Sequence, residues 1–217
     1  MKRRLSLFLS ALSLALLFSA CGGESTESPS PSPTETVSPE FETGILSDTA
    51  YENSFLGLRY TLPEGWQFAT EDEKDELAGS GNALVESELN VKAHAEDSTY
   101  YEFYAYDAEE GVSSLVLVVE DLTAHENGKL ITVKMFVDSL IDQYNNITSV
   151  QYVIGDSYRK TIGSRESIVL PIAVPEVALY QRNYVFRTGN YMASFTSTAQ
   201  SEEELDAIEE NITAITQ

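Results

Sequence analysis

Leu115–Val119, which reads LVLVV, is an unbroken aliphatic run near the middle of the chain. A strand with one face in water alternates apolar and polar residues, whereas a continuous run is typical of a strand covered on both faces. Other elements must therefore pack on each side of the sheet that contains this strand. The run decides the fold class, because it indicates a sheet placed between two covering layers.

The flanking segments fit such a layered arrangement. Tyr101–Tyr106 alternates in the manner of a further strand. After a loop at Asn127 and Gly128, apolar residues recur at helical spacing between Val133 and Tyr144, which predicts an amphipathic helix.

The outer parts of the chain supply the remaining elements. Before the run we expect strands at 44–51 and 56–62, a capped acidic helix at 70–78, an interruption at Gly79–Asn82 and a second helical piece at 83–95. After it we expect strands at 150–154, 161–162, 167–174, 178–186 and 191–197. Pro171 confines its strand to an edge or a bulge. Ser201 and Glu204 form a capping box, and a last helix carries Leu205, Ile208, Ile212 and Ile215 on one stripe.

The predicted fold is α+β: an α/β/α sandwich with a mostly antiparallel sheet and helices on both faces. Residues 41–217 have the length of one globular domain, and no repeat or internal boundary is visible.

Two patterns of this domain resemble a known family. The first is Phe55–Gly57 followed by Leu62–Trp66 and an acidic helix, and the second is Tyr191–Phe195 followed by the capping box and final helix. Both are similar to PsbP-like (DcrB-like) domains, a superfamily that includes bacterial lipoproteins. The resemblance implies an α/β/α sandwich and a binding or assembly role without catalytic residues, and it transfers no site residue to this chain.

The first 20 residues have the anatomy of a secretory signal peptide. Lys2–Arg4 are basic, Leu5–Phe18 are uncharged, and Ser19 and Ala20 are small. The segment before Cys21 resembles a lipobox, so we expect cleavage before Cys21 and lipidation (palmitate and diacylglycerol) of its thiol. A released protein is the alternative, but Phe18 fits ordinary signal peptidase poorly. The apolar run is short for a membrane-spanning helix.

Residues 21–40 read as the lipidated cysteine and a linker. The segment is rich in Ser, Pro, Thr and Glu, and it has too few apolar residues to offset the entropy of ordering. We predict a disordered spacer that holds the domain near a membrane. Cys21 is the only cysteine, so no internal disulfide forms.

Without residues 1–20 the chain keeps 10 basic and 35 acidic residues, a formal charge of −25. Such a protein is repelled by nucleic acid and by anionic lipid. We therefore expect no nucleic-acid partner, and membrane attachment through the lipid on Cys21 rather than through a basic patch.

No pattern predicts catalysis, a cofactor or a metal. Gly155–Tyr158 looks like the nucleophile block of GDSL-type esterases, but no histidine base follows it, so we interpret it as a turn. His94 and His125 lack the partners of a zinc site and are expected on the surface or in loops. Weak divalent binding by converging carboxylates stays open.

Tyrosines are the remaining hint of a binding site. Tyr104 and Tyr106 would share one face of their strand and would offer an aromatic platform for a glycan or peptide if helices left it uncovered. The interpretation we favour is that tyrosine simply suits a half-buried strand, with its hydroxyl at the wet edge.

The leading hypothesis is a membrane-anchored extracytoplasmic lipoprotein that acts as a non-catalytic binding or assembly module. It would be lipid-anchored at the cell membrane, with an envelope protein as a possible partner. The alternatives are an envelope hydrolase that uses dispersed carboxylates, which requires two of them facing each other in a cleft, and a small-solute receptor. The sequence leaves the ligand, the envelope type and the oligomeric state open.

Overall fold

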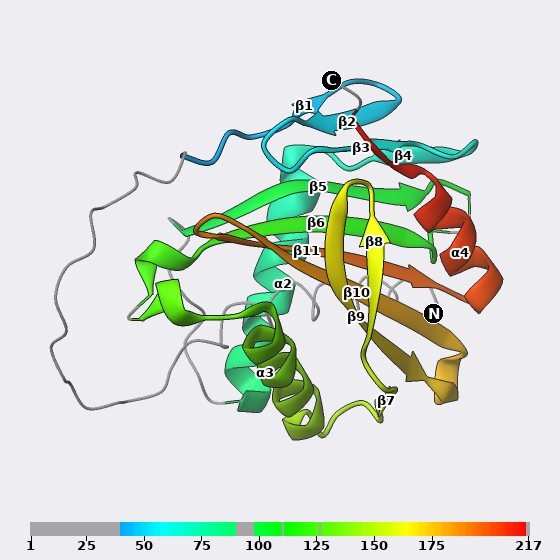
Figure 1. The fold of residues 1–217 in the computed structure, drawn as a ribbon. Coiled ribbons are helices and arrows are strands. Elements are labelled where there is room, and N and C mark those ends of the chain that lie inside the picture. Colours follow the sequence, from blue (N-terminus) through cyan, green and yellow to red (C-terminus); the bar gives the residue numbers. More distant parts are fainter. Residues whose placement is uncertain (1–39, 90–97, 110, 126, 216–217) are drawn as a thin grey trace, which may run out of the picture.

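The computed structural model describes residues 40–89, 98–109, 111–125 and 127–215. It contains a long antiparallel sheet, a smaller sheet stacked over part of it, and helices on either side (Figure 1). The helices of this described part are α2 (Glu71–Leu89), α3 (Val133–Asn146) and α4 (Glu202–Glu210), with short 3-10 turns η3 (Leu122–Ala124), η4 (Gly128–Leu130) and η5 (Pro175–Val177).

The large sheet has the strand order β4-β5-β6-β11-β10-β9-β7, and β8 also pairs with β9. Its strands are β4 (Trp66–Phe68), β5 (Thr99–Asp107), β6 (Ser114–Asp121), β7 (Val153–Ile154), β8 (Tyr158–Ile162), β9 (Arg165–Val174), β10 (Leu179–Thr188) and β11 (Tyr191–Ala199). The small sheet has the order β1-β2-β3-β12, formed by β1 (Ile45–Leu46), β2 (Ala50–Asn53), β3 (Leu58–Thr61) and β12 (Ile212–Ala214). All these pairings are antiparallel.

Strand β6 has the two-sided burial that its aliphatic run predicts. Leu115, Leu117 and Val119 point into one hydrophobic core, whereas Val116 and Val118 point into the other. The period-two geometry of a strand explains this division, since successive side chains leave on opposite faces.

Helices α2 and α3 cover the first face. Leu77 of α2 and Phe136, Val137 and Leu140 of α3 are buried there against the sheet. Helix α3 begins as its sequence predicts, because the hydroxyl of its N-cap, Thr132, accepts a hydrogen bond of 3.2 Å from the Met135 amide.

Helix α4 and the small sheet cover the second face together. Leu205 and Ile208 of α4 and Leu58 and Tyr60 of β3 are buried in the second core. The predicted α+β class, with a mostly antiparallel sheet and helices on both faces, is confirmed. The small sheet as part of the second layer is an addition to that expectation.

The predicted break at Gly79–Asn82 is wrong, because α2 continues through it to Leu89. A glycine in a helix costs only about 1 kcal/mol relative to alanine, and Gly79 has no neighbour within 4 Å of the place where a Cβ would lie. The packing of Leu77 against the first core stabilises the helix just before this weak stretch.

The last helix is shorter than predicted. It ends at Glu210, where the Asn211 side chain donates to the Ala207 carbonyl over 2.8 Å. Ile212 then starts β12, opposite Tyr60 of β3. The side chain of Ile212 is buried in the second core, as predicted from the apolar stripe. It is buried there as part of strand β12, however, and not as part of the last helix.

Pro171 lies within β9, between the part that pairs with β8 and the part that pairs with β7. Its carbonyl accepts a hydrogen bond of 2.9 Å from Gly155 on this outer side. In a strand the backbone nitrogen points to the same side as the carbonyl of its own residue. The N–H that Pro171 lacks would therefore point to the side of β7 and β8, at the place where neither strand pairs with β9.

Candidate binding groove beside helix α4

Tyr104 and Tyr106 are buried and form no exposed platform. Their rings stack at 5.2 Å between centroids, within the first core beneath α2. The Tyr106 hydroxyl donates to Glu73 over 3.2 Å and accepts a hydrogen bond from the Gln67 amide. The pair therefore joins helix to sheet, and we place the candidate site elsewhere.

His125 lies in the loop after η3, one of the two settings expected for it, but its side chain is not at the surface. Its side chain is only 4% exposed, and its Nε2 lies 2.6 Å from a carboxylate oxygen of Glu120, which is 1% exposed. The hydrogen bond that the His125 imidazole donates to the Glu120 carboxylate raises the pKa of His125 above its ordinary value despite burial. His94 lies outside the described residues, and within the described ones no cluster of three or more metal-ligating side chains occurs.

The Gly155–Tyr158 segment connects β7 to β8. Asp156 and Ser157 are exposed in this connection. Within the described residues no hydrogen bond joins Ser157 to a histidine, so no nucleophile–base pair is seen there.

Cys21 and the predicted signal peptide and linker up to residue 39 also lie outside the described residues, and their roles stay predictions. Among the helices that are described, none is long and apolar enough to cross a bilayer.

A groove of about 360 Å³ lies between α4 and the start of β4. Trp66, the only tryptophan of the chain, stands directly opposite Asp107 in the β4–β5 pairing. Paired residues of antiparallel strands place their side chains on one face, which brings this indole and this carboxylate to the same groove. The lining residues are Pro63, Trp66, Asp107, Ser113, Glu204, Ala207, Ile208 and Asn211.

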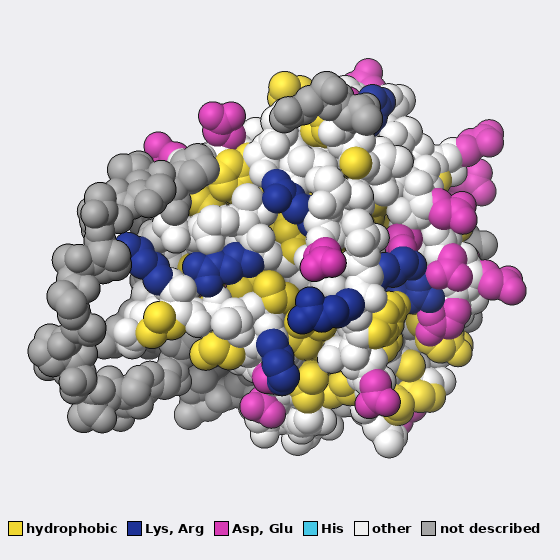
Figure 2. All heavy atoms as spheres, in the orientation of Figure 1, with side chains coloured by type: hydrophobic (Ala, Val, Ile, Leu, Met, Phe, Trp, Pro, Cys, Tyr) yellow, Lys and Arg dark blue, Asp and Glu magenta, His cyan; other side chains and the backbone are white. Residues whose placement is uncertain are grey.

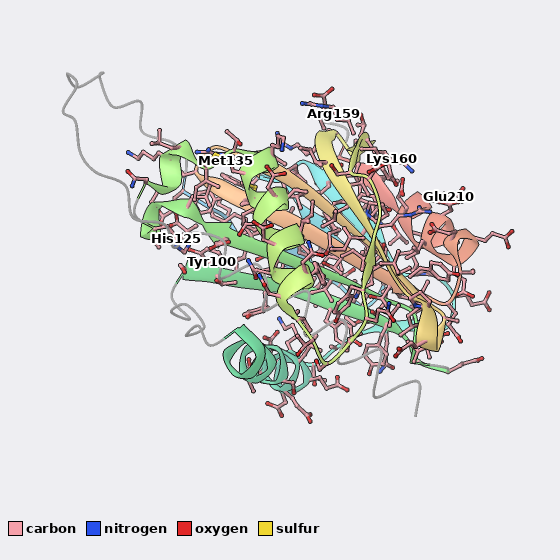
Figure 3. The ribbon with its side chains drawn as sticks, turned by 90° about the horizontal axis from the view of Figure 1, so that it is seen from below. Tyr100, His125, Met135, Arg159, Lys160 and Glu210 are labelled. Atoms are coloured by element: carbon pink, nitrogen blue, oxygen red, sulfur yellow. The ribbon has the colours of Figure 1, made fainter. Side chains whose placement is uncertain are left out.

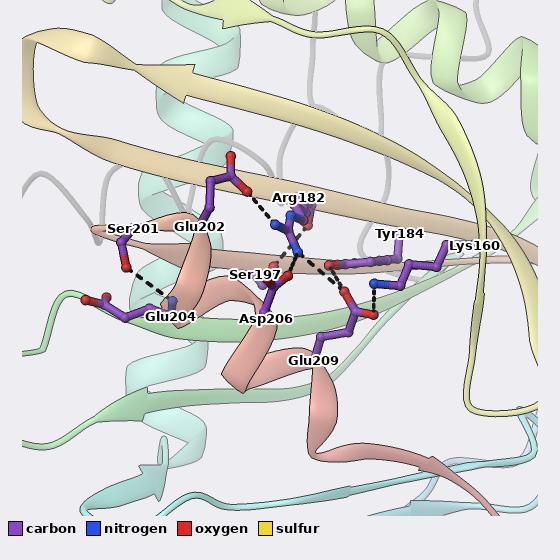
Figure 4. Close-up of polar contacts among 9 residues, drawn as sticks. All are labelled: Lys160, Arg182, Tyr184, Ser197, Ser201, Glu202, Glu204, Asp206 and Glu209. Atoms are coloured by element: carbon purple, nitrogen blue, oxygen red, sulfur yellow. Dashed lines mark hydrogen bonds and ion pairs between the residues drawn. The ribbon is translucent and has the colours of Figure 1, made fainter.

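Helix α4 is fixed beside the groove by an ionic network on its inner side (Figure 4). The Arg182 guanidinium, from β10, donates to Asp206 over 2.5 Å and also to Glu202. Glu209, one turn further along, accepts a hydrogen bond of 2.6 Å from the Tyr184 hydroxyl and pairs with Lys160. Since the sheet supplies all the donors, the network sets the position and rotation of the helix.

Burial alone would lower the pKa of Arg182, but its hydrogen bonds to Asp206 and Glu202 raise it overall. The same hydrogen bond lowers the pKa of Asp206. Both shifts favour the charged forms, so the contact between Arg182 and Asp206 is an ion pair.

The groove carboxylates have hydrogen-bond partners of their own. Glu204 accepts from the Ser113 hydroxyl and the Gln200 amide, each at 3.1 Å. Asp107 accepts from the Glu109 amide at 2.9 Å. An indole wall and two negative charges, with no basic residue in the lining, suit a ligand that presents a positive charge next to an apolar group.

Sequence reasoning did not find this groove. Trp66 was identifiable as the single tryptophan after a turn, and Ser201–Glu204 as a capping box. Their convergence depends on the packing of α4 beside β4, and no spacing in the sequence encodes that contact.

No family model matches the chain, and no curated protein matches its sequence. Among solved structures, the chain is similar to PsbP (CyanoP) of the cyanobacterium Synechocystis sp. PCC 6803, with 12% identity, a TM-score of 0.46 and coverage of 83% of this chain and 100% of that one. LpqN of Mycobacterium tuberculosis, involved in cell envelope biogenesis, gives 11% identity, a TM-score of 0.37 and coverage of 80% and 90%. A protein of Bacteroides thetaiotaomicron has 8% sequence identity and a TM-score of 0.37, and the match covers 79% of this chain and 50% of that one.

The first match agrees with the PsbP-like resemblance expected from the sequence. These likenesses concern the fold alone, and the function proposed below does not depend on them.

Proposed function

We propose that this chain is a lipid-anchored, extracytoplasmic binding or assembly module without catalytic activity. The groove between Trp66 and α4 is the observation that carries the binding role, and the lipobox-like segment before Cys21 supports the anchor. The PsbP-like fold is compatible with both.

The ligand of the groove carries a positive charge, as a lysine or arginine side chain of an envelope protein does. Acidic residues crowd this side of the molecule, along the edge formed by α4 (Figure 2). In addition to the groove residue Glu204, the helix presents Glu202, Glu203, Asp206 and Glu210 as exposed acids. Their summed field attracts cations toward the groove before contact.

Hydrolysis is the weaker proposal. A glycosidase needs two carboxylates free to act on either side of the scissile bond. Asp107 and Glu204 are the two carboxylates of the groove, and Glu204 is bound to Ser113 and to the backbone of its own helix start. This arrangement favours a fixed charge over a group that exchanges protons.

Binding in the groove can be followed by the fluorescence of Trp66, because no other tryptophan contributes. We expect an oligolysine peptide to change the emission and a neutral oligoserine peptide to leave it unchanged. The double variant Asp107→Asn, Glu204→Gln should weaken binding at least tenfold, whereas the control Glu203→Gln, Glu210→Gln removes as much charge outside the groove and should have a smaller effect. Equal losses in both variants would refute a site in the groove.

The anchor is tested separately by mass spectrometry of the protein from its native membrane. The expected result is a chain that starts at Cys21 and carries acyl groups, and that becomes unlipidated in Cys21→Ala. A released chain without lipid would contradict the anchor and leave the groove proposal standing.

A further inference from the structure

Positive charge is not spread evenly over this acidic protein. Four described cations lack a carboxylate partner, and they lie along η4, β8 and the adjoining ends of β9 and β10: Lys129, Arg159, Arg165 and Arg187. The space-filling view shows Lys and Arg side chains gathered over this face, while most acids line the edge near α4 (Figure 2). We call it the cationic face.

Two of these cations are held rigidly by backbone carbonyls. Arg165 donates to Leu56 and Phe55 over 2.7 and 2.9 Å. Arg187 donates to Gly189 over 2.8 Å and to Ile131 over 2.5 Å. Carbonyls orient a guanidinium without cancelling its charge, so these positions keep a net positive charge at the surface.

Large apolar side chains are exposed between the cations. Leu130, next to Lys129, is 70% exposed, and Met135 on α3 is 52% exposed. Val153 and Tyr158, beside Arg159, are also exposed. Seen from below, Met135 and Arg159 both point away from the sheet on the same side of the molecule, opposite α2 (Figure 3).

The acids of this region only partly offset its charge. Asp138 pairs with Lys134 over 2.6 Å, and Glu209 pairs with Lys160. Asp156 and Glu166 are exposed in the same region. The excess of 35 acidic over 13 basic residues in the chain is therefore concentrated outside the cationic face.

We infer that the cationic face lies on an anionic lipid surface. Cations mixed with exposed Leu, Met and Tyr are the combination that binds the headgroup region of a bilayer, where the charges meet lipid phosphates and the apolar groups enter the acyl boundary. The inference rests on the proposed function for one step, namely that an anchor keeps the domain beside a membrane. The new element is the identity of the face that contacts the lipid. With that face on the membrane, the groove beside α4 stays open to a partner.

The acidic helix α4 adjoins this face, since Glu209 pairs with Lys160 of β8. Electrostatic interactions in physiological salt decay over about 8 Å. Only the acids nearest this contact therefore oppose the approach of a membrane to the cationic face. Each cation near an anionic bilayer strengthens binding about fivefold, which orients a tethered domain but binds a free one only weakly.

The test uses the chain from Gly22 onward, which lacks Cys21 and includes all described residues. The fraction of protein that co-sediments with phosphatidylglycerol–phosphatidylcholine vesicles is compared with the fraction that co-sediments with vesicles of pure phosphatidylcholine. We expect binding to the anionic vesicles at low salt, loss at high salt, and no binding to the neutral vesicles. Since this chain carries no lipid, the result is independent of whether Cys21 is acylated.

Matched variants locate the binding. Lys129→Gln, Arg159→Gln removes two unpaired cations of the cationic face and should weaken binding roughly 25-fold by the same per-charge factor. Arg59→Glu changes the net charge equally on the small sheet, where Arg59 pairs with Glu52, and should change binding less than about threefold. Circular dichroism confirms that each variant is folded.

Two results would overturn the inference. One is equal weakening by both variants, which would mean that net charge and no particular face governs binding. The other is an absence of binding to the anionic vesicles at low salt. If the chain then self-associates and Lys129→Gln, Arg159→Gln abolishes this, the cationic face is assigned instead to the acidic edge of a second copy.

Discussion

Replacement of His125 by glutamine should destabilise the protein in a manner that depends on pH. Glu120 is 1% exposed, and its carboxylate has no hydrogen-bond partner in the described structure apart from the contact with His125. The fold brings the histidine back over β6 through η3, where the Asp121 carboxylate accepts from the Thr123 amide over 2.8 Å. In His125→Gln, Glu120 keeps its burial and loses its counter-charge.

The magnitude follows from the protonation of the orphaned carboxyl. An ordinary glutamate has a pKa of about 4.3, so holding it neutral at pH 7 costs roughly 4 kcal/mol. Loss of one partner of a buried pair typically costs about 3–5 kcal/mol. We therefore expect His125→Gln to lose about 3–4 kcal/mol at pH 7 and about 1 kcal/mol near pH 4.5, which is close to the ordinary pKa of a glutamate.

The wild-type protein has its own pH signature. Because the folded pKa of His125 is raised, the ion pair stabilises the fold fully below the unfolded pKa of about 6.5 and loses its contribution as the pH rises through the folded pKa. The expected slope in that window is at most about 1.4 kcal/mol per pH unit. Glu120→Gln should abolish it.

Urea unfolding across this pH range measures the free energies, and NMR of the imidazole in a His94→Gln background, where one histidine remains, reports the pKa of His125. The double variant His125→Gln, Glu120→Gln should recover most of the stability at pH 7, since two amides replace two charges. The reasoning is refuted if the imidazole titrates at or below 6.5, or if the double variant is as unstable at pH 7 as His125→Gln.

Three further substitutions test the packing of the helices and turns by urea or thermal unfolding. Arg182→Met should cost about 1–3 kcal/mol, less than a fully buried ion pair, because two of its carboxylate partners are more than half exposed; an unchanged unfolding midpoint would show that the network does not hold α4. Gly79→Ala should stabilise the protein by about 0.5–1 kcal/mol, since the position is helical and open; destabilisation would contradict a continuous α2. Gly128→Ala should destabilise by about 1–3 kcal/mol, because its Cβ would lie 1.7 Å from the Leu122 carbonyl oxygen; a neutral effect would show that η3 and η4 do not pack so closely.

The fold class could be predicted because it depends on patterns local to each element. The aliphatic run of β6 requires cover on both faces, and the apolar spacing of α3 supplies part of that cover. The C-terminal end of α4 could not be predicted in this way. Leu205, Ile208 and Ile212 fit a helical stripe equally well whether Ile212 ends a helix or starts a strand. The free edge of β3 decided it, through the pairing of Ile212 with Tyr60.

The burial of Glu120 and His125 and the contacts of the tyrosine pair could not be predicted from the sequence for a related reason. Glu120 follows an apolar run and reads as the polar end of a strand, yet the turn at η3 returns His125 over it and buries both. Tyr104 and Tyr106 could be predicted to share one face, and their burial agrees with the favoured interpretation of tyrosines in a covered strand, but the contact of Tyr106 with Glu73 of α2 was not encoded in any spacing. Contacts between elements, rather than patterns within them, determine which polar side chains are exposed.

The segregation of charge links the two surfaces of this molecule. An acidic edge and a cationic face on one chain attract the complementary surface of a second copy, and such head-to-tail contacts continue into open chains instead of closing as a symmetric dimer does. A membrane that occupies the cationic face removes one half of that contact. It follows from the two proposals that the anchored domain keeps its groove free, whereas without a membrane both charged surfaces are accessible to a second copy. Anchorage and orientation would then be parts of one arrangement, in which the lipid surface protects the binding groove from the protein's own copies.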